Sequence, residues 1–273
     1  MALRALTPDA PARTGPAPLS TAQVEQFHRD GFLVLPGFLP DDLVTRLRPE
    51  VDRWVDEGLR ARSIACAVDP AANGLPPVLE LELPAHGALI AHPPLLELLA
   101  RLMGPSFVFH HLHSDRQEPD RPGKPWHHDY EQHPQTDRTF TMIHTLHYLD
   151  GLTEDTASLV VLPGSHREVA AKDARAGRGT DPLPGELVLD RLPVGSTVVL
   201  HSALFHARRA LPEGRGTHRY FLDSSYCQTG RRWPPVKPYW RYALQRARDL
   251  RLDGGRWPEL FAERHFTEYE GPA

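Results

Sequence analysis

Hydrophobic and polar positions change their period once along the chain, near residue 105. Before that point, apolar residues recur at the spacing of three and four, which predicts a set of short helices. These helices begin at Ser20, at Pro40-Asp41 and at Leu95. Between the first two, Gly31 is placed to end a helix, and the run Phe32–Leu35 predicts a brief strand. Pro49 lies inside the second helix, so we expect a kink or a split there.

From residue 106 onward, short runs rich in β-branched and aromatic residues alternate with turn clusters. The predicted strands cover residues 107–112, 139–149, 159–162, 187–189, 197–200 and 219–226. Within the second of these, Met142, Leu146 and Tyr148 alternate with more polar positions, so one face of that strand is apolar. This pattern predicts a mainly β protein with a jelly-roll core and with the N-terminal helices packed on one sheet. The C-terminal segment predicts irregular structure and then a helix from about Trp240.

The composition is that of an ordinary globular protein, with 273 residues, 40% hydrophobic residues, 24% charged residues and a formal net charge of −4. Since neither a linker nor a repeat interrupts the pattern, we expect a flexible segment over residues 1–19 and one domain over residues 20–273. No apolar run resembles a signal peptide or a membrane span, so we expect a cytoplasmic protein without a membrane partner. Without a basic block, nucleic acid is not an expected partner. The expected partner is a small molecule, and both a monomer and a homodimer stay open.

The chain contains 16 histidines but only 2 cysteines. This count excludes a disulfide scaffold and a cysteine-rich zinc module, and we expect Cys66 and Cys227 to be free thiols. The count does not exclude a metal site built from imidazole and carboxylate groups.

A candidate for such a site is the stretch Pro-Trp-His-His-Asp at residues 125–129. In an extended chain, His127 and Asp129 point to one side and His128 points to the other. An imidazole and a carboxylate on one face form two thirds of the facial triad that holds Fe(II) in many oxygenases. Alone, this short pattern also fits a solvated polar turn, and a third ligand must come from elsewhere.

The third ligand has two candidates, His201 and His206, on an apolar run that follows the turn residue Gly195. In one regular strand, residues five apart face opposite ways, so only one of the two histidines can belong to the site. The next predicted strand begins near Arg219. If it pairs with the preceding strand, the Arg219 guanidinium lies about one strand spacing from the metal, where it can bind a ligand carboxylate through two hydrogen bonds.

Four motifs, in chain order, resemble those of the phytanoyl-CoA dioxygenase-like branch of the Fe(II)/2-oxoglutarate oxygenases. The first is F-x-x-D-G-F-x-V-L-P-G-F at residues 27–38, and the second is W-H-x-D at residues 126–129. The third is L-x-V-L-P-G-S-H at residues 159–166, and the fourth is G-x-x-V-x-x-H-x-x-x-x-H at residues 195–206, followed by an arginine. Together they span most of the chain, and their joint occurrence is far more specific than any one motif.

Carried over residue by residue, the resemblance implies a double-stranded β-helix in which His127, Asp129 and His206 bind Fe(II). It implies that Arg219 binds the distal carboxylate of 2-oxoglutarate. Trp126 is expected to fix the strand by packing, with contact to the cosubstrate as a further expectation. His201 falls at a position that does not bind metal in this family. The loop between His206 and Arg219 is longer than is usual in the family, which makes Arg215 a competitor, and we prefer Arg219 because it lies in a predicted strand.

The reaction implied by the resemblance consumes 2-oxoglutarate and O2, releases succinate and CO2, and hydroxylates an unactivated C–H bond of a small organic molecule. Specialised-metabolite biosynthesis is the expected setting. Asp129 favours hydroxylation over chlorination, because related halogenases have glycine or alanine at this position. Desaturation, epoxidation and ring formation stay open. The rival class is a metal-binding, cupin-like jelly roll without oxygenase activity, which would not need Arg219.

Other polar residues carry weaker predictions. His166 follows a Pro-Gly turn and is read as structural, while one of His110, His111 and His113 is a candidate for the pocket wall. A group of basic residues surrounds the expected pocket mouth: Arg121, Lys124, Arg208, Arg209, Arg231 and Arg232. They could recruit an anionic substrate, although charged loops are more often simply solvated.

Overall fold

The computed structural model describes residues 18–211 and 216–271. Most of the expected N-terminal segment therefore lies outside the described residues, as does Arg215. Leu19, within that segment, is buried against the core, so the packed part of the chain begins earlier than we expected. Within the two described ranges, no helix is both long enough and apolar enough to span a membrane.

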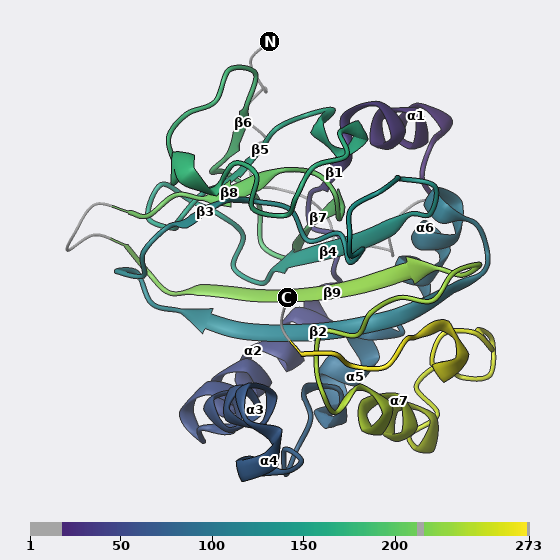
Figure 1. Ribbon diagram of the computed structural model, residues 1–273. Helices are drawn as coiled ribbons and strands as arrows, with labels where there is room; N and C mark the ends of the chain where they lie inside the picture. The colour runs from purple at the N-terminus through teal and green to yellow at the C-terminus, as the bar shows by residue number, and fades with distance from the viewer. Residues whose placement is uncertain (1–17, 212–215, 272–273) are drawn as a thin grey trace.

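Two antiparallel sheets form the centre of the molecule (Figure 1). The larger sheet has the order β1-β7-β4-β9-β2, and the smaller sheet has the order β3-β8-β5-β6. The strands are β1 (Phe32–Leu35), β2 (Phe107–Gln117), β3 (Lys124–His127), β4 (Met142–Tyr148), β5 (Leu159–Val161), β6 (Leu187–Leu189), β7 (Ser196–His201), β8 (His206–Arg208) and β9 (Arg219–Gln228). This arrangement confirms the mainly β, jelly-roll prediction, although β2 is longer than its sequence pattern indicated.

Helices flank the larger sheet. They are α1 (Thr21–Asp30), α2 (Asp41–Asp56), α3 (Leu59–Val68), α4 (Pro70–Asn73), α5 (Pro84–Ile90), α6 (Pro93–Met103) and α7 (Trp240–Asp249). Figure 1 shows α2, α5 and α7 beneath β2 and β9, so helices from both ends of the chain cover one sheet. The C-terminal helix begins at Trp240, as predicted. Pro49 lies inside α2, which continues past it as one helix, so of the two expected outcomes the split is wrong and the kink stays a prediction.

The first helix ends as its sequence predicts. Ser20 and Gln23 form a reciprocal capping box at its start, and Gly31 adopts a left-handed conformation with φ 83° at its end. The Gly31 carbonyl then accepts a hydrogen bond of 2.8 Å from the backbone N–H of His201. This bond ties the end of α1 to the end of β7, next to the point where the chain leaves the larger sheet.

Two strand assignments from the sequence are wrong. His201 and His206 do not share a strand, because β7 ends at His201 and β8 begins at His206 in the other sheet. The connecting residues 202–205 are buried, so the chain crosses between the sheets through the interior, which an apolar pattern cannot reveal. Likewise, β9 pairs with β4 and β2 and not with the strand before it. Arg219 therefore lies on the sheet opposite His206.

Candidate metal centre and adjoining pocket

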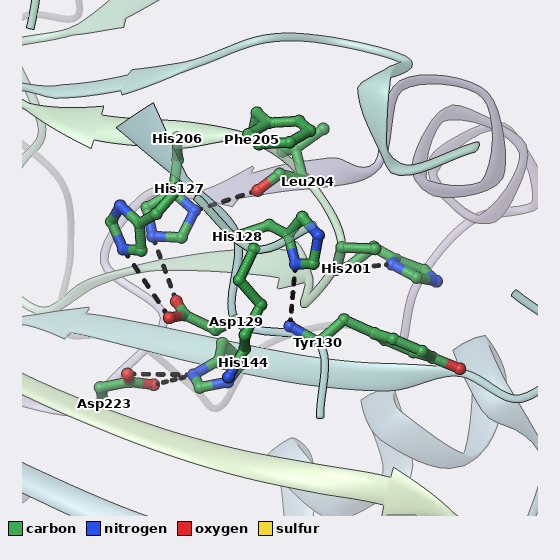
Figure 2. A network of polar contacts seen from close by, with 12 residues as sticks. His127, His128, Asp129, Tyr130, His144, His201, Leu204, Phe205, His206 and Asp223 are labelled. Atoms are coloured by element: carbon green, nitrogen blue, oxygen red, sulfur yellow. Dashed lines mark hydrogen bonds and ion pairs between the residues drawn. The ribbon is translucent and has the colours of Figure 1, made fainter. Parts of the chain in front are cut away.

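The structure brings together the three side chains that the sequence singles out as metal ligands (Figure 2). His127 ends β3, His206 begins β8, and the two are partners in the register of that strand pair. Asp129 follows two residues after His127, beyond the end of the strand, where its backbone N–H donates to Ser202 O at 2.7 Å. Its carboxylate lies 3.7 Å from His127 Nε2 and 3.3 Å from His206 Nε2. One nitrogen or oxygen from each side chain lies within 4.8 Å of the other two.

Backbone carbonyls fix the orientation of both imidazoles. His127 Nδ1 lies 2.7 Å from Pro125 O, and His206 Nδ1 lies 3.0 Å from Leu204 O. Because a carbonyl can only accept, each Nδ1 must carry the proton and donate it, which leaves each Nε2 with a free lone pair facing Asp129. His127 Nε2 is buried and has no hydrogen-bond partner among the described residues. Two basic nitrogens held in this way beside a carboxylate fit a divalent iron ion.

The charge states suit metal binding. Burial lowers the pKa of His127 to about 3, with a further contribution from His206, so this imidazole is neutral near pH 7. Burial alone would raise the pKa of Asp129, but Lys124 and the two imidazoles outweigh it and hold that pKa well below its ordinary value. Metal ligands must be deprotonated, and both of these groups already are at neutral pH.

A cavity of about 490 Å³ adjoins the three side chains and lies between the two sheets. Its walls include Leu146, Leu159 and Phe221, together with Arg219 on β9. This volume is within the usual range for a pocket that holds a small organic ligand. Of the three β2 histidines considered from the sequence, His113 lines the cavity.

Arg219 is held ready for an anionic ligand. Its Nη2 donates to the Tyr148 hydroxyl at 3.0 Å, its Nη1 donates to Ala157 O at 3.2 Å, and its guanidinium lies over the rings of Tyr148 and Phe221. The side chain is buried, and its Nε has no hydrogen-bond partner in the parts of the chain that the structure describes. No carboxylate among these residues pairs with it, so it can bind a carboxylate that enters the cavity.

Several other sequence candidates lie away from the three side chains. Trp126 is fully buried with Val160 and Phe205, and its Nε1 donates to Asp181 O at 2.9 Å. This position supports the packing role of Trp126 and gives no support to a contact with the cosubstrate. His201 stacks on Tyr130 with ring centroids 6.0 Å apart and is not part of the group formed by His127, Asp129 and His206.

The basic residues of the expected pocket mouth divide into two sets. Arg121, Lys124 and Arg208 line the cavity, whereas Arg209, Arg231 and Arg232 do not. Arg209 pairs with Glu186, and Arg231 lies over the ring of Trp233. Arg60, on α3, lines the cavity as well. The sequence reasoning missed Arg60, because nothing in its helical surroundings indicates contact with a pocket.

A second polar group on the larger sheet was also missed. His111, His144 and Asp223 come from β2, β4 and β9, and their ligand atoms lie within 4.8 Å of one another. Here two imidazole nitrogens have hydrogen-bond partners: His144 Nδ1 lies 2.8 Å from one Asp223 oxygen and 3.0 Å from the other, and His111 Nδ1 lies 2.7 Å from Ser225 Oγ. His144 Nε2 is buried and has no hydrogen-bond partner among the described residues. Burial opposes the charged form of His144, but Asp223 raises its pKa above the ordinary value. This group is therefore a hydrogen-bonded network beside the cavity, which Asp223 lines.

A jelly roll that presents two histidines and one aspartate to an internal cavity is the arrangement of the non-haem iron oxygenases. The chain belongs to the phytanoyl-CoA dioxygenase (PhyH) family, whose model matches residues 27–210. The match ends before Arg219, so the case for that residue depends on its position in the structure and on the motif order.

Curated relatives include an ectoine dioxygenase and a proline hydroxylase. The chain is 29% identical over 156 residues to an ectoine dioxygenase of Bordetella bronchiseptica, a match that covers 55% of this chain and 50% of the relative. It is 26% identical over 218 residues to an L-proline trans-4-hydroxylase of Streptomyces griseoviridis, covering 70% of this chain and 80% of the relative. Against the ectoine dioxygenase, the chain spans about half of the relative's length.

Among solved structures, EctD from S. alaskensis with bound 2-oxoglutarate and 5-hydroxyectoine is similar, with a TM-score of 0.62 and 21% sequence identity. The similarity covers 82% of each chain. At this identity, the comparison establishes the shared fold.

Proposed function

We propose that this protein is an Fe(II)/2-oxoglutarate-dependent dioxygenase that hydroxylates an unactivated C–H bond of a small organic molecule. His127, Asp129 and His206 are the proposed iron ligands, and Arg219 is the proposed partner of the distal carboxylate of 2-oxoglutarate. The observation that carries the proposal is the orientation of the two imidazoles, whose Nδ1 atoms are held by backbone carbonyls while both Nε2 atoms face one carboxylate.

When bound, the iron supplies activation of O2, coupled to conversion of 2-oxoglutarate into succinate and CO2. His127, Asp129 and His206 would hold the ion through three ligands, and its remaining positions would be available to cosubstrate and oxygen. The role of the protein is to hold the metal ion and to orient the cosubstrate and the substrate beside it. Arg219 neutralises and positions one end of the cosubstrate, and the apolar side chains Leu146, Leu159 and Phe221 limit access of water to the cavity.

The names of the relatives support the reaction type, since one oxidises ectoine and the other hydroxylates proline. Asp129 supports hydroxylation over chlorination, because its carboxylate occupies the position that a halide ligand would need. A role in specialised-metabolite biosynthesis belongs to the same proposal. We also infer that residues 20–273 act as one domain, because a single core cluster includes residues from Leu19 to Phe266. A cytoplasmic location stays a prediction.

An anaerobic titration tests the proposal. Addition of 2-oxoglutarate to the Fe(II)-loaded protein is expected to produce the weak visible charge-transfer band of the iron chelate. Its absence would favour a metal-binding, cupin-like protein. Incubation of candidate metabolites with Fe(II), 2-oxoglutarate and O2, followed by mass spectrometry, then separates the outcomes: hydroxylation adds one oxygen atom, whereas desaturation and ring formation remove two hydrogens.

A further inference from the structure

A buried carboxylate holds two arginines at the edge of the cavity. Asp115, on the inward side of β2, has a side chain that is only 4% exposed. One of its oxygens lies 3.1 Å from Arg60 Nε, and the other lies 2.5 Å from Arg121 Nη1. Arg60 comes from α3 and Arg121 from the connection between β2 and β3, and both line the cavity beside the proposed iron site. A single fixed anion therefore positions two cations from different parts of the chain.

Positive charge exceeds negative charge along this wall. Lys124 also lines the cavity, and no hydrogen bond or ion pair of its side chain is found within residues 18–211 and 216–271. Among the described residues, Arg208 hydrogen-bonds only to neutral groups, Gln117 Oε1 at 2.8 Å and Pro122 O at 2.6 Å. In the same part of the chain, Asp115 is the one carboxylate that pairs with any of these four cations.

The excess of positive charge affects a neighbouring group on the cavity wall. Burial lowers the pKa of His113 to about 3, and Lys237, Arg60, Lys124 and Arg121 lower it further. His113 therefore experiences a positive potential, which an anion in the cavity would relieve.

The other acidic groups on the cavity wall do not balance this charge. Asp129 belongs to the proposed iron site, and both oxygens of Asp223 face His144 Nδ1. Arg219 has its own proposed ligand, the distal carboxylate of 2-oxoglutarate. Small-molecule pockets are mostly apolar with few charged groups, so a set of cations without a matching acid points to a ligand that supplies the negative charge.

We propose that the substrate carries an anionic oxygen group, a carboxylate or a phosphate, and that Arg60, Arg121 and Lys124 bind it as an anion clamp. This inference rests on the proposed function and names the class of its substrate. Guanidinium groups suit such a ligand because their donors match two oxygens at once, and Asp115 reduces the entropy lost on binding by holding both arginines in place. Since clamp and iron ligands line one cavity, the acid group and the oxidised carbon belong to one small molecule.

The test uses simple anions as probes. The protein is loaded with Mn(II), a paramagnetic substitute for Fe(II), and is saturated with 2-oxoglutarate so that the metal and Arg219 are occupied. The ³¹P resonance of inorganic phosphate and the ¹⁹F resonance of trifluoroacetate are then recorded, with trifluoroethanol as the neutral control. Both anions are expected to broaden through proximity to Mn(II), and trifluoroethanol is not. The anion that binds more tightly identifies the acid group as phosphate or carboxylate.

Two variants and one control decide the role of the clamp. Arg121→Gln and Lys124→Gln are each expected to weaken binding of the anion by about tenfold, the usual effect of losing a charge-assisted contact. Both side chains are solvent-accessible enough for substitution, since Arg121 is 41% exposed and Lys124 is exposed. Arg232→Gln, at an exposed position that does not line the cavity, is expected to leave binding unchanged.

Equal broadening in wild type and in both variants would overturn the proposal, as would absence of broadening or equal broadening of trifluoroethanol. The Fe(II) and 2-oxoglutarate band, measured on the same preparations, separates this failure from failure of the proposed function. If the protein forms the band but binds neither anion, the proposed function stands and the anion clamp is contradicted. A protein that binds the anion but forms no band contradicts the oxygenase assignment.

Discussion

His127 and His206 face each other as register partners of β3 and β8, with ring centroids 4.2 Å apart. Side chains directly opposite in an antiparallel pair are held close by the ladder itself, so the two nitrogens converge without help from a long loop. The carbonyls of Pro125 and Leu204 then set the rotation of each ring. The site is therefore organised by backbone hydrogen bonds before any metal enters.

Asp129→Ala is predicted to weaken iron binding and to abolish succinate formation. The carboxylate is the anionic member of the triad, and its loss removes a direct ligand. We expect a loss of iron affinity greater than the roughly 10-fold to 100-fold that follows changes to groups behind the ligands. Metal analysis after dialysis and a succinate assay measure both effects. Full turnover in this variant would mean that the triad has been misplaced.

Asp223→Asn is the matched control for that substitution. It removes a carboxylate from the same cavity, but one that is hydrogen-bonded to His144. We expect this variant to bind one iron per chain, as wild type does. Loss of iron from Asp223→Asn and not from Asp129→Ala would assign the metal to the group of His111, His144 and Asp223.

Arg219→Gln is predicted to raise the KM for 2-oxoglutarate. A charge-assisted contact to a carboxylate contributes about 1.5–3 kcal/mol, which corresponds to a rise of about 10-fold to 100-fold. Tyr148→Phe removes only the hydroxyl that orients the guanidinium, so a smaller rise is expected. Steady-state kinetics with varied 2-oxoglutarate compares the two. An unchanged KM in Arg219→Gln would contradict the role of Arg219 and would favour Arg215 as the residue that binds the cosubstrate carboxylate.

The sequence predicted the site residues that lie close together in the chain, but not the contacts between residues far apart in the chain. The spacing of His127 and Asp129 is visible in any extended chain, and the resemblance supplied His206. The argument from one shared strand was wrong, because nothing local shows that the chain changes sheets between His201 and His206. The pairing of Asp115 with Arg60 and Arg121 was not predicted, for the same reason: a contact between α3 and β2 depends on tertiary packing.

Glu50→Gln is predicted to destabilise the protein by about 1–3 kcal/mol, since Glu50 accepts hydrogen bonds at the start of α5. Its carboxylate takes the backbone N–H groups of Ala85 and His86, at 2.9 Å and 3.1 Å, and contacts His86 Nδ1 at 2.9 Å. Burial would raise the pKa of Glu50, but these hydrogen bonds lower it below its ordinary value of 4.5.

The same shift predicts how this effect changes with pH. Because the folded-state pKa is lowered, the stabilisation is complete above the ordinary pKa of 4.5 and is lost as the pH falls through the folded-state value. Denaturant unfolding of wild type and of Glu50→Gln at several pH values measures it. The difference in unfolding free energy should shrink below pH 4.5, and a difference that grows there would contradict the assignment.

Gly31→Ala is predicted to weaken both the fold and the metal site. Gly31 has φ 83°, and an added Cβ would lie 2.5 Å from His166 Nδ1 and 2.8 Å from Leu204 Cδ1. Leu204 is the residue whose carbonyl orients His206, so a displaced Leu204 would disturb a ligand. We expect a loss of about 1–2 kcal/mol from the left-handed backbone and a further 1–3 kcal/mol from the clash.

Gly58→Ala separates these two contributions. Gly58 also has a positive φ, 70°, but an added Cβ there would meet nothing within 4 Å. This variant should therefore show the backbone cost alone and should keep wild-type affinity for iron. Thermal or denaturant unfolding compares the stabilities, and iron titration compares the sites. If both variants lost equal stability and both kept full iron affinity, the packing of α1 against residues 202–205 would not constrain His206, and the orientation of that ligand would depend on the β3–β8 ladder alone.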